Sequence, residues 1–82
     1  MINIAVLVSG GGTNLQALID AQAADKIENG CIRLVISSNP GAFALERAAK
    51  AFIPSAVLRR RDFDSAEDYG AALTALLEEY EI

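Results

Sequence analysis

The stretch Ser9-Gly10-Gly11-Gly12-Thr13-Asn14-Leu15-Gln16 contains the residue types best suited to bind a ligand. Its three consecutive glycines lie where an apolar segment of strand character gives way to helical spacing. The first N–H groups of a helix have no partner within the helix, and glycine lets an anion approach the backbone without a Cβ in the way. The stretch therefore predicts an anion site, above all for phosphate, at the start of a helix.

The donors expected in this site are mostly backbone groups. We expect the N–H groups of Gly11, Gly12 and Thr13 to hold the phosphate. The hydroxyl of Thr13 and the side-chain amide of Asn14 are further donors. A glycine-rich turn that binds no ligand stays open as the alternative, although three glycines exceed what a tight turn requires.

Two common nucleotide-binding loops fit the stretch poorly. A P-loop ends in a lysine that grips phosphate, and no lysine or arginine occurs before Lys26. A dinucleotide fingerprint has a third glycine or alanine where Leu15 stands, and an acidic residue after the next strand, where the sequence reads Ser37-Ser38-Asn39. NAD is therefore not an expected cofactor.

Three short apolar segments, at 2–8, 31–36 and 55–58, predict strands, with Arg33 interrupting the second. A helical pattern follows each of them, which predicts an α/β fold of parallel strands joined by right-handed crossovers. The predicted sheet order is 3-2-1, half of a doubly wound, Rossmann-like domain with the first strand at an open edge. Because nothing blocks that edge, we expect the chain to continue past Ile82 or to self-associate through the first strand.

The predicted helices carry recognisable start signals. Thr13 and Gln16 form a capping-box pattern at the start of a helix expected to reach residue 24. Asp64 or Ser65 is expected to cap a third helix that runs to the end of the chain. The predicted buried stripe of the second helix comprises Phe43, Ala44, Leu45, Ala48, Ala49 and Phe52. That of the third helix comprises Tyr69, Leu73, Leu76, Leu77 and Tyr80.

Composition excludes several classes of function. A net charge of -4 argues against a basic face for nucleic acid. The absence of histidine excludes a Ser-His-Asp triad or a histidine-ligated metal within this sequence, and the single cysteine, Cys31, excludes an internal disulfide or a cysteine-based zinc cluster. No apolar segment has the length of a membrane span. We therefore expect a cytoplasmic, metal-free binding protein with no membrane contact.

The sequence resembles the phosphoribosylglycinamide formyltransferase family. The resemblance lies in Ser9 to Leu18, Val35-Ile36-Ser37-Ser38-Asn39, Ala42 to Ala48 and Phe63-Asp64-Ser65. It implies that residues 1–82 are the incomplete, N-terminal phosphate-binding part of a formyltransferase domain. Such an enzyme transfers a formyl group from 10-formyltetrahydrofolate, its co-substrate, to glycinamide ribonucleotide in de novo purine biosynthesis. In that family a Gly-Ser/Thr-Asn triplet binds the substrate phosphate, which carries over to Gly12, Thr13 and Asn14.

The resemblance also implies what this stretch of the enzyme lacks. The family's catalytic Asn, His and Asp lie beyond the length of this chain, so no catalytic residue is expected within it and the chain by itself is expected to be inactive. Some members place a basic residue directly after Phe-Asp-Ser, near the folate. Here Ala66 stands in that place, and Arg61 is the candidate for a folate-side contact, with a solvated Arg59-Arg60-Arg61 loop as the alternative.

Phe52 departs from the family pattern near the end of the second helix. Glycine is common there in the family, and a bulky residue at positive φ is strained. We therefore expect either a different cap or an earlier end of the helix. The alternative function is a small non-catalytic phosphate-binding or interaction module that pairs through its first strand.

Overall fold

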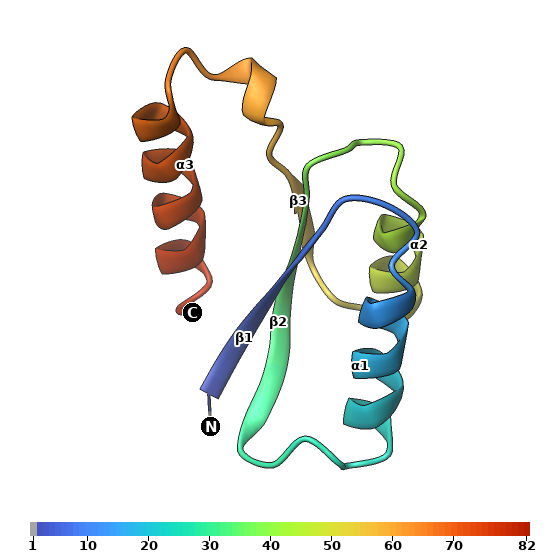
Figure 1. Cartoon of the computed structure of the whole chain (residues 1–82). Helices are drawn as coiled ribbons and strands as arrows, with labels where there is room; N and C mark the ends of the chain where they lie inside the picture. Colours follow the sequence, from blue (N-terminus) through green and yellow to red (C-terminus); the bar gives the residue numbers. More distant parts are fainter. Residues whose placement is uncertain (1) are drawn as a thin grey trace.

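A computed structural model of the chain describes residues 2–82. It contains one parallel sheet of strands β1 (Ile2–Val8), β2 (Gly30–Ser37) and β3 (Ser55–Val57), in the spatial order β1-β2-β3 (Figure 1). The helices are α1 (Thr13–Ala23), α2 (Phe43–Lys50) and α3 (Ala66–Glu79), with a short 3-10 turn, η1 (Arg60–Asp62), before α3. The predicted α/β class, parallel strands and sheet order are confirmed.

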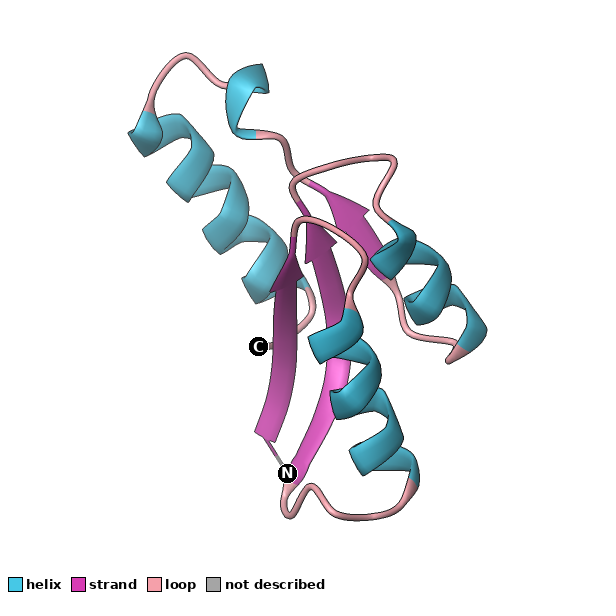
Figure 2. Cartoon of the chain, turned by 45° about the vertical axis from the view of Figure 1, so that its right-hand side comes forward, coloured by secondary structure: helices cyan, strands magenta, loops and turns pink. Residues whose placement is uncertain are grey.

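The helices lie on both faces of the sheet. Helices α1 and α2 cover one face, and α3 lies against the other (Figures 1 and 2). A hydrophobic core cluster lies on the side of α1 and α2, as expected when two successive crossovers have the same hand. Its buried members are Leu15, Ile32, Val35, Ala42, Ala44, Ala48 and Ile53.

Strand β2 contains a bulge at the position where Arg33 was expected to interrupt it. Ile4 pairs with Ile32, but the next residue of β1, Ala5, pairs with Leu34, so Arg33 is one residue extra. Its side chain is exposed, and its Nε donates a hydrogen bond to the neighbouring strand. The bulge therefore lets β2 keep a polar residue without placing it in the core.

Helix α3 is capped as predicted but only partly covered. The Ser65 hydroxyl accepts a hydrogen bond from the Asp68 N–H at 3.1 Å, which settles the choice between Asp64 and Ser65. All five residues of its predicted apolar stripe are half-buried, and no residue of the helix is fully buried. The chain after the helix is tied to β1, because the Asn3 side chain donates to the Glu81 carbonyl at 2.9 Å.

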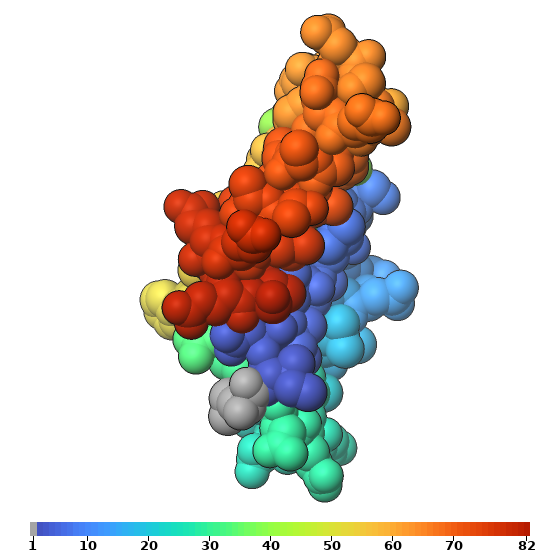
Figure 3. Space-filling model, turned by 90° about the vertical axis from the view of Figure 1, so that its left-hand side faces the viewer, coloured from blue at the N-terminus to red at the C-terminus, as the bar shows by residue number. Residues whose placement is uncertain are grey.

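Strand β1 lies at the edge of the sheet, as predicted. Ile2 and Leu7 are 67% and 58% exposed. Figure 3 shows β1, in dark blue, partly uncovered beside α3, in red. Within the described chain this edge therefore offers unpaired backbone groups together with apolar side chains.

The predicted buried stripe of α2 is only partly correct. Ala44 and Ala48 are fully buried, whereas Phe43 is 45% exposed and Ala49 is also on the surface. Phe43 is the first residue of the helix, and its ring lies under the guanidinium of Arg47, 4.8 Å from ring centroid to Cζ. The aromatic ring thus contacts a cation at the surface rather than the core.

Phe52 adopts the strained conformation that the sequence was expected to avoid. Helix α2 ends at Lys50, and Phe52 follows it with φ 59°. The Ile53 N–H donates to the Ala48 carbonyl at 2.9 Å and the Phe52 N–H to the Ala49 carbonyl at 3.1 Å, which together form a Schellman motif. Neither expected way of avoiding a positive φ at Phe52, a different cap or an earlier end of the helix, is realised, and the turn directs Ile53, 8% exposed, into the core.

Replacing Phe52 with glycine should therefore stabilise the chain. Glycine removes the left-handed penalty of a residue with a Cβ, and the Phe52 side chain is 94% exposed, so little packing is lost. We expect Phe52→Gly to raise the free energy of unfolding by about 1 kcal/mol, measured by urea denaturation. Phe52→Ala is the matched control, since it removes the same ring but keeps the Cβ, and it should stay near the wild-type value. Equal gains in both variants would assign the effect to the ring and not to the backbone.

Candidate phosphate site

The glycine stretch forms the connection between β1 and α1. Gly12 is the N-cap of α1 and has left-handed dihedral angles, φ 78° and ψ 32°. The helix therefore begins one residue earlier than the capping-box pattern requires, and Gln16 falls at the fourth helical position, one residue beyond the third position from which it could reach back. Its side chain instead donates to Asp20 Oδ1 at 2.9 Å. The predicted Thr13 cap is wrong, and α1 has no side-chain cap.

Gly12 is required by the fold itself. A Cβ at this residue would lie 2.6 Å from the Cβ and 2.9 Å from the Cα of Ala44, which begins the inner face of α2. The positive φ adds a second requirement for glycine. Gly10 and Gly11 differ, because a Cβ on either would meet no described atom within 4 Å and neither has a positive φ. The fold therefore leaves open space where the side chains of Gly10 and Gly11 would be, and a ligand can approach the backbone there.

Helix α2 fixes the direction of two peptide groups in this loop. The Ala44 N–H donates to the Gly10 carbonyl at 3.3 Å, and Arg47 Nε donates to the Gly11 carbonyl at 2.7 Å. In a trans peptide the C=O of one residue and the N–H of the next point in opposite directions. The N–H groups of Gly11 and Gly12 therefore point away from α2.

Those N–H groups are available to a ligand. Neither donates a hydrogen bond to any part of the chain within residues 2–82. The N–H groups of Thr13 and Asn14 belong to the first turn of α1 and have no partner within the helix, and both side chains are exposed. An open hollow of about 260 Å³ adjoins the loop and contains no residue of α2. It is lined by Val6, Leu7, Val8, Ser9, Gly10, Gly12, Thr13, Asn14 and Leu15.

The structure thus brings Gly12, Thr13 and Asn14 together around one hollow, with Gly11 beside them in the loop. Four neighbouring N–H groups, two of them oriented by α2, form an arrangement that can surround one anion. The positive end of the α1 dipole adds a stabilisation of about 0.3–2 kcal/mol for a negative group placed there. Such a site suits a phosphate held through its oxygens, with the rest of the ligand bound elsewhere.

Arg47 is the residue at this site that sequence reasoning missed. The sequence around the glycines contains no cation, and Arg47 is 36 residues from Gly11 along the chain. A signal existed in its spacing, because Arg47 is three residues after the buried Ala44 and next to the buried Ala48. A cation on the inner stripe of a helix needs an acceptor there.

Arg61 lies in a different hollow from the glycine loop. This second hollow, of about 360 Å³, is lined by Ser38, Asn39, Pro40, Arg59, Arg60 and Arg61, and it shares no residue with the first. Arg59 forms an ion pair with Asp62 at 3.2 Å, and Arg60 lies over the Tyr69 ring at 5.9 Å. Arg61 is exposed. The structure therefore does not place Arg61 with the four predicted phosphate ligands.

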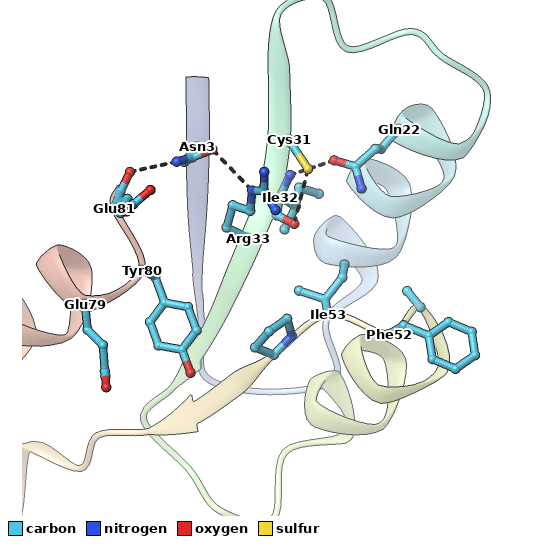
Figure 4. Close-up of a pocket in the computed structure, with 12 residues that line it drawn as sticks. Asn3, Gln22, Cys31, Ile32, Arg33, Phe52, Ile53, Glu79, Tyr80 and Glu81 are labelled. Carbon is cyan, nitrogen blue, oxygen red and sulfur yellow. Dashed lines mark hydrogen bonds between the residues drawn. The ribbon is translucent and has the colours of Figure 1, made fainter. Parts of the chain in front are cut away.

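A third hollow, of about 530 Å³, lies near the amino ends of the strands (Figure 4). The Gln22 side-chain oxygen accepts from the Ile32 N–H at 2.6 Å, and Asn3 bridges Arg33 and the Glu81 carbonyl. Figure 4 shows Phe52 pointing away from this hollow. Ligands of parallel α/β sheets bind at the carboxyl ends of the strands, so this end is not the candidate site.

The described residues offer neither a metal site nor a membrane span. Residues 2–82 contain no group of three or more side chains placed to hold a metal ion. No helix in the same range combines the length and apolar character of a membrane span.

This chain is similar to known proteins over most or all of its described length. The family model for formyl transferases matches residues 2–82. Phosphoribosylglycinamide formyltransferase of Escherichia coli is 46% identical over 79 residues, which cover 96% of this chain and 37% of that protein. The trifunctional purine biosynthetic protein adenosine-3 of Drosophila melanogaster is 52% identical over 73 residues, or 87% of this chain and 5% of that protein.

Solved structures give the same result for the fold. Glycinamide ribonucleotide transformylase 1 from Symbiobacterium toebii superposes with a TM-score of 0.92 and 38% identity, over all of this chain and 38% of that one. The protein of the same name from Geobacillus kaustophilus gives a TM-score of 0.93 and 32% identity, over all of this chain and 43% of that one. This chain spans less than half the length of each of these relatives. The match of the family model from residue 2 to residue 82 shows that the chain belongs to the formyl transferase family.

Proposed function

We propose that this chain supplies the substrate-phosphate site of a phosphoribosylglycinamide formyltransferase in purine biosynthesis. The proposed substrate is glycinamide ribonucleotide, and Gly11, Gly12, Thr13 and Asn14 are its proposed phosphate ligands. The formyl donor is 10-formyltetrahydrofolate. The relatives that carry this enzyme's name support the proposal, as does the match to the formyl transferase family.

One geometric observation carries the proposal for the site. The Gly11 and Gly12 N–H groups point away from α2, because α2 holds the carbonyls of the residues before them. A Cβ at Gly11 would meet no described atom within 4 Å, so the backbone there is open to a ligand. Donors held in place before binding lose little freedom when the anion arrives.

In this proposal the chain contributes binding and not bond making. A phosphate held at the start of α1 fixes one end of glycinamide ribonucleotide, so its amine is presented at a defined distance from the loop. Interactions with such a non-reacting part of a substrate can be used to orient the reacting part. We assign the formyl transfer itself to groups outside residues 2–82, and Arg61 to the folate side of the site. Cys31 as the single cysteine fits a reducing compartment, which supports a cytoplasmic enzyme.

Nuclear magnetic resonance titration of the 15N-labelled 82-residue chain tests the proposed site. Inorganic phosphate and glycinamide ribonucleotide should shift the Gly11, Gly12, Thr13 and Asn14 amide signals saturably. Gly11→Val should weaken both affinities by about tenfold or more, because its side chain would stand in the open space over the loop. Arg61→Met is the matched control and should leave phosphate affinity unchanged. Unchanged affinity in Gly11→Val, or no saturable shift in the wild type, would contradict the proposal.

The open edge of β1 favours the second candidate, an interaction module. We propose that this edge pairs with another strand, through which copies of the chain associate. Sedimentation velocity over a range of concentrations tests this proposal on the same samples. If the chain is a monomer at all concentrations and binds phosphate, the interaction module is ruled out and the phosphate site of the enzyme is the function that stands.

A further inference from the structure

We infer that Arg47 is a positioning residue for the phosphate loop. By holding the Gly11 carbonyl on the side of α2, its guanidinium keeps the Gly12 N–H directed toward the anion. The inference rests on the proposed function for the identity of the ligand, and on hydrogen bonds within the chain for the geometry.

Three contacts fix the orientation of the Arg47 guanidinium. Its Nε donates to the Gly11 carbonyl at 2.7 Å, and one terminal nitrogen donates to the Gln16 side-chain oxygen at 3.1 Å. The Phe43 ring lies 4.8 Å away. Gln16 is itself held, because its amide nitrogen donates to Asp20. A planar guanidinium that donates to two acceptors and lies against an aromatic ring has little freedom to turn.

The charge of Arg47 matters as well as its shape. No carboxylate within residues 2–82 forms an ion pair with it, so its positive charge is not compensated by an acidic partner in the described chain. A charged donor on a peptide carbonyl strengthens the polarity of that peptide group, which includes the Gly12 N–H. The guanidinium thus both orients this donor and favours negative charge near it.

A purely structural role is the competing explanation. Arg47 links α2 to α1 through Gln16, and this link could serve only to hold the two helices together. The two roles differ in what happens to the loop. A positioning residue affects the order of the Gly11 and Gly12 amides and the affinity for phosphate, whereas a helix link affects only stability.

The test compares three variants of the 82-residue chain with the wild type. Arg47→Met keeps an apolar stem and removes the donors, and Arg47→Lys keeps the charge but not the planar fork. Lys50→Met is the matched control, because it removes one positive charge from the same helix and the Lys50 side chain makes no hydrogen bond or ion pair within residues 2–82. For each variant, 15N relaxation measures loop order without ligand, titration with inorganic phosphate gives the dissociation constant, and urea denaturation gives stability.

We expect Arg47→Met to reduce the order of the Gly11 and Gly12 amides and to weaken phosphate binding by about tenfold. Arg47→Lys should weaken it by about threefold or more, because an ammonium cannot hold both acceptors in one plane. Lys50→Met should change it by less than about twofold, since an exposed charge is screened. Wild-type loop order in Arg47→Met, or wild-type affinity in Arg47→Lys, would overturn the inference. If Arg47 orders the wild-type loop but phosphate does not bind, the positioning role stands and the proposed function fails.

Discussion

Gly12→Ala is expected to lower the free energy of unfolding by about 2–4 kcal/mol. The added Cβ would lie 2.6 Å from the Ala44 Cβ and 2.9 Å from its Cα, distances at which α2 must move away from the loop. The residue would also keep φ 78°, which is unfavourable for alanine. The two effects add because one is a contact between elements and the other is local to the backbone.

Gly11→Ala is the matched control for this loss. It makes the same chemical change one residue earlier, where no described atom lies within 4 Å of the new Cβ and φ is not positive. Its free energy of unfolding should stay within about 0.5 kcal/mol of the wild type in urea denaturation. Equal destabilisation in the two variants would show that flexibility of the loop, and not the approach of α2, makes Gly12 necessary.

Leu15→Ala is expected to lower the free energy of unfolding by about 2–5 kcal/mol. Leu15 is 1% exposed and packs in the first turn of α1 within the core cluster that includes Val35 and Ala44. Truncation removes buried apolar surface and leaves a cavity between α1 and the sheet. Because Leu15 follows Asn14 directly, the cavity lies beneath the proposed phosphate ligands.

Leu18→Ala provides the control for this prediction on the same helix. Leu18 is 41% exposed, so the same truncation should lower the free energy of unfolding by less than about 1 kcal/mol. Urea denaturation followed by circular dichroism measures both. A Leu15→Ala loss no larger than that of Leu18→Ala would mean that the first turn of α1 is not anchored in the core.

The sequence was sufficient for the architecture because each strand and helix carried a local pattern. The apolar strands before the glycines and around Arg33 were visible, and their alternation with helices determined the parallel sheet. Ser65 was identified as one of two caps by its position before an amphipathic segment. The family resemblance, now confirmed by the family match, came from the glycine block together with three later segments of the sequence.

The wrong details all depended on contacts between elements. Thr13 and Gln16 matched a capping box, but the close packing of Ala44 requires a glycine N-cap and shifts the helix start. Phe43 was predicted to be a core residue, but its ring contacts the Arg47 guanidinium at the surface. Phe52 has a positive φ in a turn that buries the next residue, Ile53. The helix propensity of a residue does not include such contacts with other elements, so sequence patterns alone could not predict them.

The proposed site itself was half predictable. The positions of Gly12, Thr13 and Asn14 around one hollow follow from a strand, a tight turn and a helix start, all local features. The spacing of Arg47 indicates only that its side chain needs an acceptor, and the identity of that acceptor, the Gly11 carbonyl, depends on α2 lying beside α1 on the same face of the sheet. Which carbonyls are held, and hence which N–H groups point outward, needs that second helix.

This dependence on α2 has a consequence for how the chain folds. A peptide that ends after α1 would contain every glycine of the loop but neither the Ala44 N–H nor the Arg47 guanidinium that orient it. The loop can reach its binding geometry only after β2 has paired and α2 has docked, which is a long-range event along the chain. Ligand affinity therefore belongs to the cooperative unit from β1 through α2, and any anion bound there selects against partly folded forms of that unit.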